Sequence, residues 1–212
     1  MMWFGIHFLF AGLVLTISAL TDEECRPLKM PKSLADHSVL FGKMHFIAGY
    51  TDLDVFQAIL NITDSSWIEF SDAPGNPEEL VMFESNKLNG NCVTSNINIT
   101  IDGNKATASG ANFTSEFQLL PSCDGCLALI MNTTIKNLDS LLKLMKIDIK
   151  PESNDVRALS FYLLANETSL PESDLENFKN QASCFGFTRD PDYQYDPKKA
   201  FCQKDEGVHI LL

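Results

Sequence analysis

The sequence predicts an all-β fold: a closed antiparallel sheet of eight strands with one α-helix packed on its outside. Short segments alternate between apolar and polar residues, which is the period of a half-buried strand. The polar faces of three segments carry Asn-x-Thr acceptors for N-linked sugars, and a sugar-bearing side chain must face water. Strands do not alternate with helices along the chain, so a parallel sheet is not expected.

The segment of residues 92–101 shows the alternation most clearly. One face carries a valine and three isoleucines, and the other carries Asn98, the acceptor of a sequon. Two further segments, residues 112–119 and 126–132, also place a sequon asparagine opposite an apolar face. These strands have a sugar-bearing exterior and an apolar interior. A closed sheet provides both and also removes exposed edges.

Five other segments complete the set of eight strands. They are residues 43–50, 66–71, 80–85, 106–109 and 158–165. Clusters rich in Pro, Gly, Asn and Asp at 73–77, 89–91 and 102–104 provide turns between neighbouring segments. Strands this close in sequence can pair as antiparallel neighbours, so an up-and-down order is expected.

The helix outside the sheet is expected over residues 171–184. Acidic residues occupy its first turn, where they favour the helix dipole. An apolar stripe follows at helical spacing and consists of Leu175, Phe178, Ala182 and Phe185. Phe161 and Leu163 lie on the face of the last strand opposite Tyr162, so they are expected to meet this stripe.

A second amphipathic segment covers residues 137–147, between two strands where a short hairpin would suffice. Leu138, Leu141, Leu142 and Met145 share one face of it. Two interpretations stay open. The segment is either a loop helix that covers one end of the barrel or a lid that contacts a ligand.

The composition of the 212 residues excludes several classes of protein. Sixteen basic and 28 acidic residues give a net charge of −12. Nucleic-acid binding needs a basic surface, and anionic membranes would repel this chain. A hydrophobic content of 45% with 15 phenylalanines excludes intrinsic disorder.

Residues 1–19 are expected to be a secretory signal peptide, and residues 20–212 a single domain. The segment has no charged side chain, is apolar and ends in small residues. A membrane anchor is the alternative, but acidic residues follow the segment instead of a basic stop-transfer cluster. Five sequons support secretion and a glycosylated surface: Asn61, Asn98, Asn112, Asn132 and Asn166.

Six cysteines in an oxidising compartment indicate disulfides, and their spacing alone does not select the pairing. Cys123 and Cys126 form a Cys-x-x-Cys pair that is either a redox motif or a local bridge. Pro121 precedes the pair and a strand follows it, which favours the bridge because a redox pair opens a helix. Three mature histidines, none at ligand spacing, predict no metal site.

Residues 42–50 resemble the first-strand motif of the lipocalins, with Met44 in place of the tryptophan of the motif. The C-terminal third resembles alpha-1-acid glycoprotein at residues 159–162, 175–178, 184, 192–199 and 202. Apolipoprotein M is similar at residues 46–49 and 178–184. Residues 121–126 and 181–184 are similar to the saxitoxin- and tetrodotoxin-binding lipocalins of pufferfish and their fish relatives.

The resemblance implies an eight-stranded antiparallel up-and-down lipocalin barrel with one C-terminal α-helix packed outside. It also implies three disulfides, namely Cys25 with Cys184, Cys92 with Cys202, and Cys123 with Cys126. A barrel of this size can hold one small ligand.

The expected ligand wall combines the inward faces of the strands. Its apolar members are Phe46, Ile68, Phe70, Met82, Ile97, Ile99, Phe113, Phe117, Leu129 and Met131. The alternative is that these residues fill the closed half of the barrel as core.

Four polar residues are expected to add specificity. Alignment with alpha-1-acid glycoprotein implies that Glu84 and Tyr162 line the pocket, with Ser160 beside Tyr162 and Tyr50 near the mouth. A carboxylate in an apolar cup favours a cation, because a charge removed from water needs a partner. The alternative for Glu84 is a solvated rim residue.

The resemblance implies a secreted plasma glycoprotein that carries a small amphipathic or cationic ligand, with guanidinium neurotoxins such as saxitoxin and tetrodotoxin as specific candidates. A carrier of lipids or other apolar ligands and an acute-phase, immune-modulating glycoprotein are the alternatives. An enzyme is not expected, since no Ser-His-acid arrangement is visible and all six cysteines can pair. Neither a cofactor, a nucleic-acid partner nor stable membrane insertion is expected, and the protein is expected to be a monomer.

Overall fold

The computed structural model describes residues 20–211, and at residues 77 and 78 it describes the backbone alone. The expected signal peptide, residues 1–19, lies outside the described residues. Among the described residues, no helix has both the length and the apolar character needed to cross a membrane.

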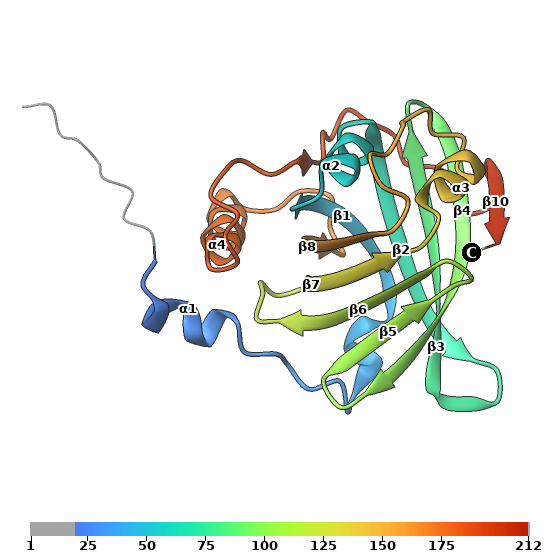
Figure 1. Cartoon of the computed structure of the whole chain (residues 1–212). Helices are drawn as coiled ribbons and strands as arrows, with labels where there is room; N and C mark the ends of the chain where they lie inside the picture. Colours follow the sequence, from blue (N-terminus) through green and yellow to red (C-terminus); the bar gives the residue numbers. More distant parts are fainter. Residues whose placement is uncertain (1–19, 212) are drawn as a thin grey trace, which may run out of the picture.

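Eight strands form a closed antiparallel barrel, as predicted (Figure 1). They are β1 (Gly42–Thr51), β2 (Thr63–Ala73), β3 (Asn76–Leu88), β4 (Asn91–Asp102), β5 (Lys105–Ser109), β6 (Phe113–Leu120), β7 (Cys126–Ile135) and β8 (Val156–Ala165). Each strand pairs with the next, and β8 pairs with β1 to close the barrel. The alternation of β4 is confirmed, because Val93, Ile97 and Ile99 are buried whereas Asn98 is exposed.

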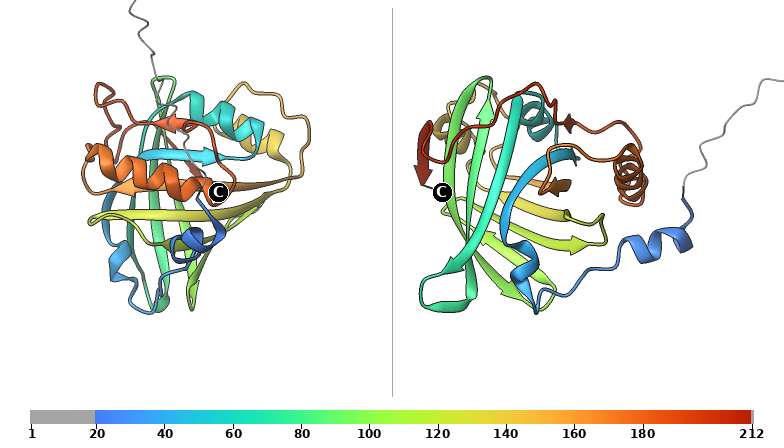
Figure 2. Two further views of the ribbon diagram at one scale, coloured as in Figure 1. Left: turned by 90° about the vertical axis from the view of Figure 1, so that its left-hand side faces the viewer. Right: turned by 180° about the vertical axis from the view of Figure 1, so that it is seen from behind.

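The helix α4 (Glu172–Ser183) packs on the outside of the barrel, as predicted (Figure 2). The Phe178 ring stacks on Phe161 with the two centroids 4.6 Å apart. Leu163 and Ala182 belong to the same buried cluster, which also includes Ile130 on the outer face of β7. The outer faces of β7 and β8 are therefore apolar where α4 covers them.

Short helices surround the barrel. At one end lie α2 (Asp54–Asn61) and α3 (Leu138–Leu144), while the β2–β3 hairpin marks the other end (Figure 1). The helices α1 (Asp22–Leu28) and η1 (His37–Leu40) precede the first strand. The amphipathic segment 137–147 does form a helix over the barrel end, and its side chains are considered with the cavity below.

The C-terminal segment fills two gaps in the barrel wall. The strand β2 pairs with β1 only as far as His45, and β9 (Tyr193–Gln194) pairs with β1 beyond that point, at Ala48 and Gly49. At the other side, β10 (Val208–Leu211) pairs with β4 in parallel. This parallel pair is the one departure from the predicted antiparallel order among the described strands.

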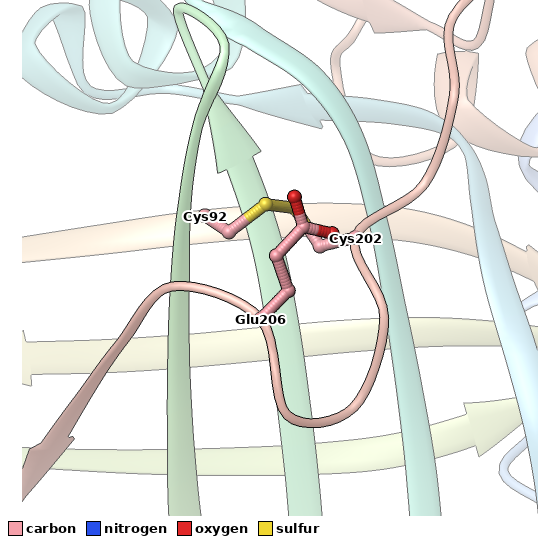
Figure 3. Close-up of side chains that lie close together, drawn as sticks. All are labelled: Cys92, Cys202 and Glu206. Atoms are coloured by element: carbon pink, nitrogen blue, oxygen red, sulfur yellow. A yellow bond between two sulfur atoms is a disulfide. The ribbon is translucent and has the colours of Figure 1, made fainter.

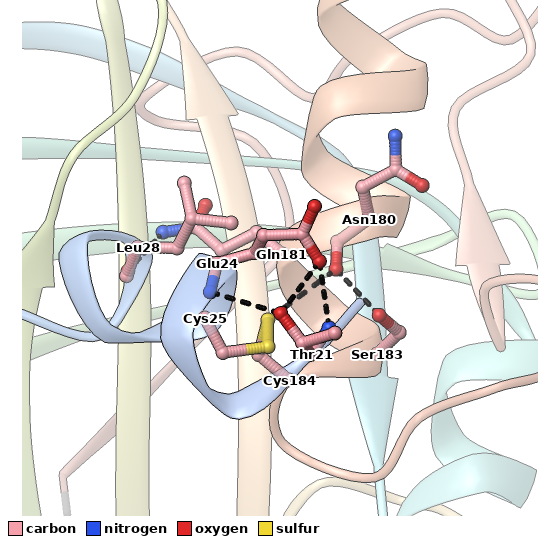
Figure 4. Close-up of a disulfide and its surroundings, with 8 residues drawn as sticks. All are labelled: Thr21, Glu24, Cys25, Leu28, Asn180, Gln181, Ser183 and Cys184. Atoms are coloured by element: carbon pink, nitrogen blue, oxygen red, sulfur yellow. Dashed lines mark hydrogen bonds between the residues drawn. A yellow bond between two sulfur atoms is a disulfide. The ribbon is translucent and has the colours of Figure 1, made fainter. Parts of the chain in front are cut away.

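The three disulfides implied by the lipocalin resemblance are confirmed. Cys25 and Cys184 join α1 to the end of α4 (Figure 4). Beside this bridge, Gln181 Nε2 donates a hydrogen bond of 2.7 Å to the Leu28 carbonyl and another of 3.2 Å to Pro121. A covalent bond and a buried amide thus hold the N-terminal segment against α4.

The second disulfide joins Cys92 at the start of β4 to Cys202 in the C-terminal segment (Figure 3). The Glu206 carboxylate lies close to both sulfur atoms, within 4.8 Å. Because the two sulfurs are bonded to each other, they are not thiolates and do not act as metal ligands. The bridge anchors the segment that leads into β10.

Candidate ligand-binding cavity

A cavity of about 290 Å³ lies inside the barrel, lined in part by residues of α2 and α3. Its walls are the inward faces of the strands, and most of the lining side chains are apolar. Ten residues of the expected site line it, namely Ile68, Phe70, Met82, Glu84, Ile97, Phe113, Phe117, Leu129, Met131 and Tyr162. Alternation along the strands identified the apolar positions, and the resemblance to alpha-1-acid glycoprotein implied those of Glu84 and Tyr162.

The two short helices supply the roof of the cavity. From α2, Phe56, Ile59 and Leu60 reach it, and from the α3 region Leu138, Leu141, Leu142 and Met145 do so. The helix α3 covers the barrel end and also borders the cavity, and the interpretation of the segment 137–147 as a lid that contacts a ligand stays a prediction. The helix α2 was not expected, although its apolar residues at helical spacing were a usable signal.

The C-terminal strand also contributes to the wall. Ile210 of β10 lines the cavity and packs with Leu138 and Leu142 of α3. No sequence pattern links residue 210 to this site, because its place depends on pairing with β4, more than 100 residues earlier.

Glu84 is the acidic centre of the cavity. Its Oε1 accepts a hydrogen bond of 2.8 Å from Asn86 Nδ2, and its Oε2 accepts one of 3.4 Å from Ser95 Oγ. Burial raises the pKa of Glu84, and the two hydrogen bonds oppose that rise in part. Glu84 therefore lies inside the barrel and is not a solvated rim residue.

The Glu84 carboxylate has no cationic partner within the described part of the chain. The ion pairs found there join other groups, and no lysine, arginine or histidine lies within 4.0 Å of this carboxylate. A half-buried acid with neutral donors alone costs free energy to ionise, and a cation entering the cavity would lower that cost.

Tyr162 lies near Glu84 and completes the polar side of the cavity. Burial, together with the negative charge of Glu84, raises the pKa of Tyr162 to about 12, so the phenol stays protonated and can donate. Its ring packs on Phe46, with the centroids 4.8 Å apart. Phe46 lines a smaller side chamber of about 170 Å³, which shares Glu84, Asn86 and Tyr162 with the main cavity.

Tyr50 does not line the cavity, which corrects the expectation that it lies at the mouth. A β-bulge between Phe46 and Ala48 shifts the register of β1, and a shift of one residue exchanges the two faces of a strand. Tyr50 consequently points outward and packs between Phe178 and Phe187 under α4. The alternation of inward and outward residues along β1 is therefore reversed beyond the bulge.

Ser160 faces the interior but does not reach the cavity. Its hydroxyl donates a hydrogen bond of 3.1 Å to Thr51 Oγ1, and both side chains are buried. Ser160 therefore makes a structural hydrogen bond, and its expected role in binding stays a prediction. Ile99, also expected in the wall, is fully buried core, while Met131 does line the cavity.

The asparagines of the five sequons are all exposed: Asn61, Asn98, Asn112, Asn132 and Asn166. Each side chain is therefore accessible for the attachment of a sugar, as the prediction of a sugar-bearing exterior requires. Whether sugars are attached stays a prediction.

Solved structures with a similar fold are found, while a scan of protein-family models and a search of curated protein sequences give no match. The siderocalin Ex-FABP superposes with a TM-score of 0.51 at 14% identity, over 70% of this chain and 88% of that chain. The chain has the lipocalin fold. The bovine lipocalin allergen Bos d 2 gives a TM-score of 0.47 at 15% identity, over 71% and 88% of the two chains. An odorant-binding protein, OBP1, gives a TM-score of 0.48 at 11% identity, over 70% of this chain and 85% of that chain.

The superposition on Ex-FABP shows the fold alone and says nothing of the contents of the cavity. The narrower resemblance to alpha-1-acid glycoprotein, apolipoprotein M and the pufferfish toxin-binding lipocalins stays a prediction. The chemistry of the lining residues is the basis for the function proposed next.

Proposed function

We propose that this protein is a secreted carrier that binds one small amphipathic cation inside its lipocalin barrel. The observation that carries the proposal is Glu84, a half-buried carboxylate that borders the cavity and has no cationic partner among the described residues. The siderocalin with a similar fold is reported to function through dual ligand specificities, which is consistent with a binding role.

The electrostatics favour a cation. A carboxylate removed from water loses its hydration, and its two hydrogen bonds to Asn86 and Ser95 restore only part of that loss. A ligand cation would supply the remaining interaction as a charge-assisted hydrogen bond. The hydroxyl of Tyr162 and the amide of Asn86 lie in the same chamber and can orient polar groups of the ligand.

The size and the lining favour a compact amphipathic molecule. An engineered cavity of about 150 Å³ lined by apolar side chains holds benzene, and this cavity is about twice that volume. Phe70, Phe113 and Phe117 offer flat apolar contacts in the wall of the cavity. Guanidinium neurotoxins such as saxitoxin and tetrodotoxin are specific candidates because of the resemblance to the pufferfish lipocalins.

Secretion is supported by the chemistry of the surface. Six cysteines form three disulfides, which persist in oxidising compartments, and the sequon asparagines face water. The protein would then circulate as an extracellular glycoprotein, with the plasma as the expected location and the monomer as the working unit.

A carrier of lipids or other apolar ligands is the second candidate. The observation in its favour is the roof, where α2 and α3 add seven apolar side chains to an already apolar wall. An acute-phase glycoprotein that modulates immune cells through its surface is a third class. It differs from both carriers because its binding to cells would survive filling of the cavity.

Equilibrium dialysis separates the two carriers. The purified protein, freed of endogenous lipid, is dialysed against saxitoxin, an amphipathic amine, its neutral isostere and a fatty acid. The proposal predicts one-site binding of a cation, and weaker binding of the same cation by Glu84→Gln. Glu69→Gln is the matched control, because Glu69 lies on the outer face of the neighbouring strand and pairs with Lys204.

Equal affinity of wild type and Glu84→Gln for every cation would contradict the proposed role of Glu84. Binding of the fatty acid alone would support the lipid carrier.

A further inference from the structure

A second hollow lies at the end of the barrel opposite the cavity. It has a volume of about 330 Å³ and is bordered by the start of β1, the end of β6 and the turn that holds Cys123 and Cys126. The strand β1 begins at this end and reaches α2 at the other. The two hollows are separated along β6 and β7, where Phe117 and Leu129 line the cavity and Leu119 and Leu127 line the second hollow.

The hollow exposes apolar side chains to water. Val39 is 51% exposed and Phe41 is 39% exposed, and both line the hollow. Polar groups stand beside them, since Lys32, Ser33 and Asp124 also contribute to the lining. A surface that is half apolar and half polar suits an amphipathic occupant.

Asn166 stands on the rim of this hollow, directly after the last residue of β8. It is the acceptor of the sequon that ends at Thr168, and it is exposed. Its backbone N–H donates a hydrogen bond of 3.0 Å to the Gly125 carbonyl, which holds it above the turn.

Gly125 leaves the space that the Asn166 side chain occupies. A Cβ at position 125 would lie 2.6 Å from the Asn166 Oδ1, and the φ of +70° at Gly125 is a conformation that favours glycine. The depression beside Asn132 differs from this hollow because its lining is polar and consists of threonines, Glu116 and Arg157. It offers no apolar side chain on which a sugar could pack.

We propose that the N-linked glycan of Asn166 covers this hollow, with its first N-acetylglucosamine seated against Phe41 and Val39. The ring of this sugar has a face of C–H groups that can pack on apolar side chains. Its hydroxyl and acetamido groups can exchange hydrogen bonds with Lys32, Ser33 and Asp124. The inference rests on the secretion included in the proposed function, since only a secreted chain receives the sugar.

Hydroxyl-radical footprinting tests the proposal on full-length protein secreted by eukaryotic cells. Glycopeptide mapping first establishes which sequons are occupied. The test variant is Thr168→Ala, which removes the sequon at an exposed residue and keeps Asn166. The control is Thr100→Ala, which removes the sequon of Asn98 on the outer face of β4.

We expect oxidation of Val39 and Phe41 to rise several-fold in Thr168→Ala and to stay at the wild-type level in Thr100→Ala. Enzymatic trimming of the glycan to its first sugar should preserve the protection. Loss of protection on trimming would overturn the assigned seat of that sugar.

Two outcomes would overturn the proposal in distinguishable ways. If Asn166 is unoccupied while Asn98 is occupied, or if Thr168→Ala leaves the oxidation unchanged, the cover is absent and secretion still stands. If every sequon is unoccupied, both the cover and the glycoprotein part of the proposed function are wrong.

Discussion

Among single residues, Glu84 is expected to lower the stability of the ligand-free protein and to favour the binding of a cation. A glutamate side chain in the unfolded chain has a pKa of about 4.3. Burial raises the pKa of Glu84 in the folded protein, so the folded chain holds this proton more tightly than the unfolded chain does. The contribution of Glu84 to the free energy of unfolding therefore falls as the pH rises from the unfolded pKa through the folded pKa.

The variant Glu84→Gln should raise the free energy of unfolding of the ligand-free protein at about pH 8, because at that pH Glu84 is ionised in the unfolded chain, whereas burial disfavours its ionisation in the folded chain. The gain should shrink toward zero at about pH 3, where the carboxyl is neutral in both states. Urea titrations at the two pH values, with Glu69→Gln as the control for loss of one charge, measure it. A gain of equal size at both values would show that ionisation of Glu84 is not the cause.

Tyr50 is predicted to be structural. Its hydroxyl is buried and has no hydrogen-bond partner among the described residues, while its ring stacks on Phe187 with the centroids 5.3 Å apart. Tyr50→Phe should leave the free energy of unfolding unchanged or raise it by up to about 1 kcal/mol, because an unpartnered polar group is removed. Dialysis of the variant should give wild-type affinity, and a clear loss would mean that Tyr50 reaches the ligand.

Among the secondary-structure elements, α3 is predicted to act as part of the roof. Leu141 lines the cavity, whereas Leu144 on the same helix is 46% exposed. Leu141→Ala removes three carbons of apolar contact with the ligand at about 0.8 kcal/mol per carbon, so affinity should fall by up to about 60-fold. Leu144→Ala is the matched control. Stopped-flow release of a fluorescent ligand measures both variants, and identical release would show that α3 merely closes a loop.

The disulfides are predicted to differ in their effect on stability. Cys25 and Cys184 are 159 residues apart in sequence, and Cys123 and Cys126 are three apart. In the chain-entropy model the long loop is worth about 5 kcal/mol and the short one about 2 kcal/mol. Replacing each pair by serines and titrating with urea tests this order. A larger loss from the short loop would mean that local strain or packing outweighs chain entropy.

The parts of the fold that are determined by residues close together in the sequence were predictable, and the parts that depend on distant residues were not. Strand β4 is regular, so alternation placed Ile97 and Ile99 inside and Asn98 outside. Strand β1 contains a bulge, so the same rule placed Tyr50 on the wrong face. Bulges leave no mark in the alternation of a single sequence, because the extra residue is defined by the partner strand.

The parts of the site that were missed come from segments with weak or remote signals. The helix α2 has only eight residues. Its apolar residues do have helical spacing, but a stretch this short gives a weak periodic signal. Ile210 lines the cavity through a parallel pairing between β10 and β4. The disulfide pairs were inferred from the lipocalin resemblance, since spacing alone leaves the pairing open.

For the whole molecule, the most direct measurement is dialysis of the best cationic ligand against barrel-filling variants. Ala108→Phe and Leu129→Phe each add volume to the wall of the cavity and leave the outer surface unchanged. We expect both to remain folded by near-ultraviolet circular dichroism and to lose most of the affinity for the ligand. Wild-type affinity in both folded variants would place the binding site outside the barrel and contradict the proposed carrier.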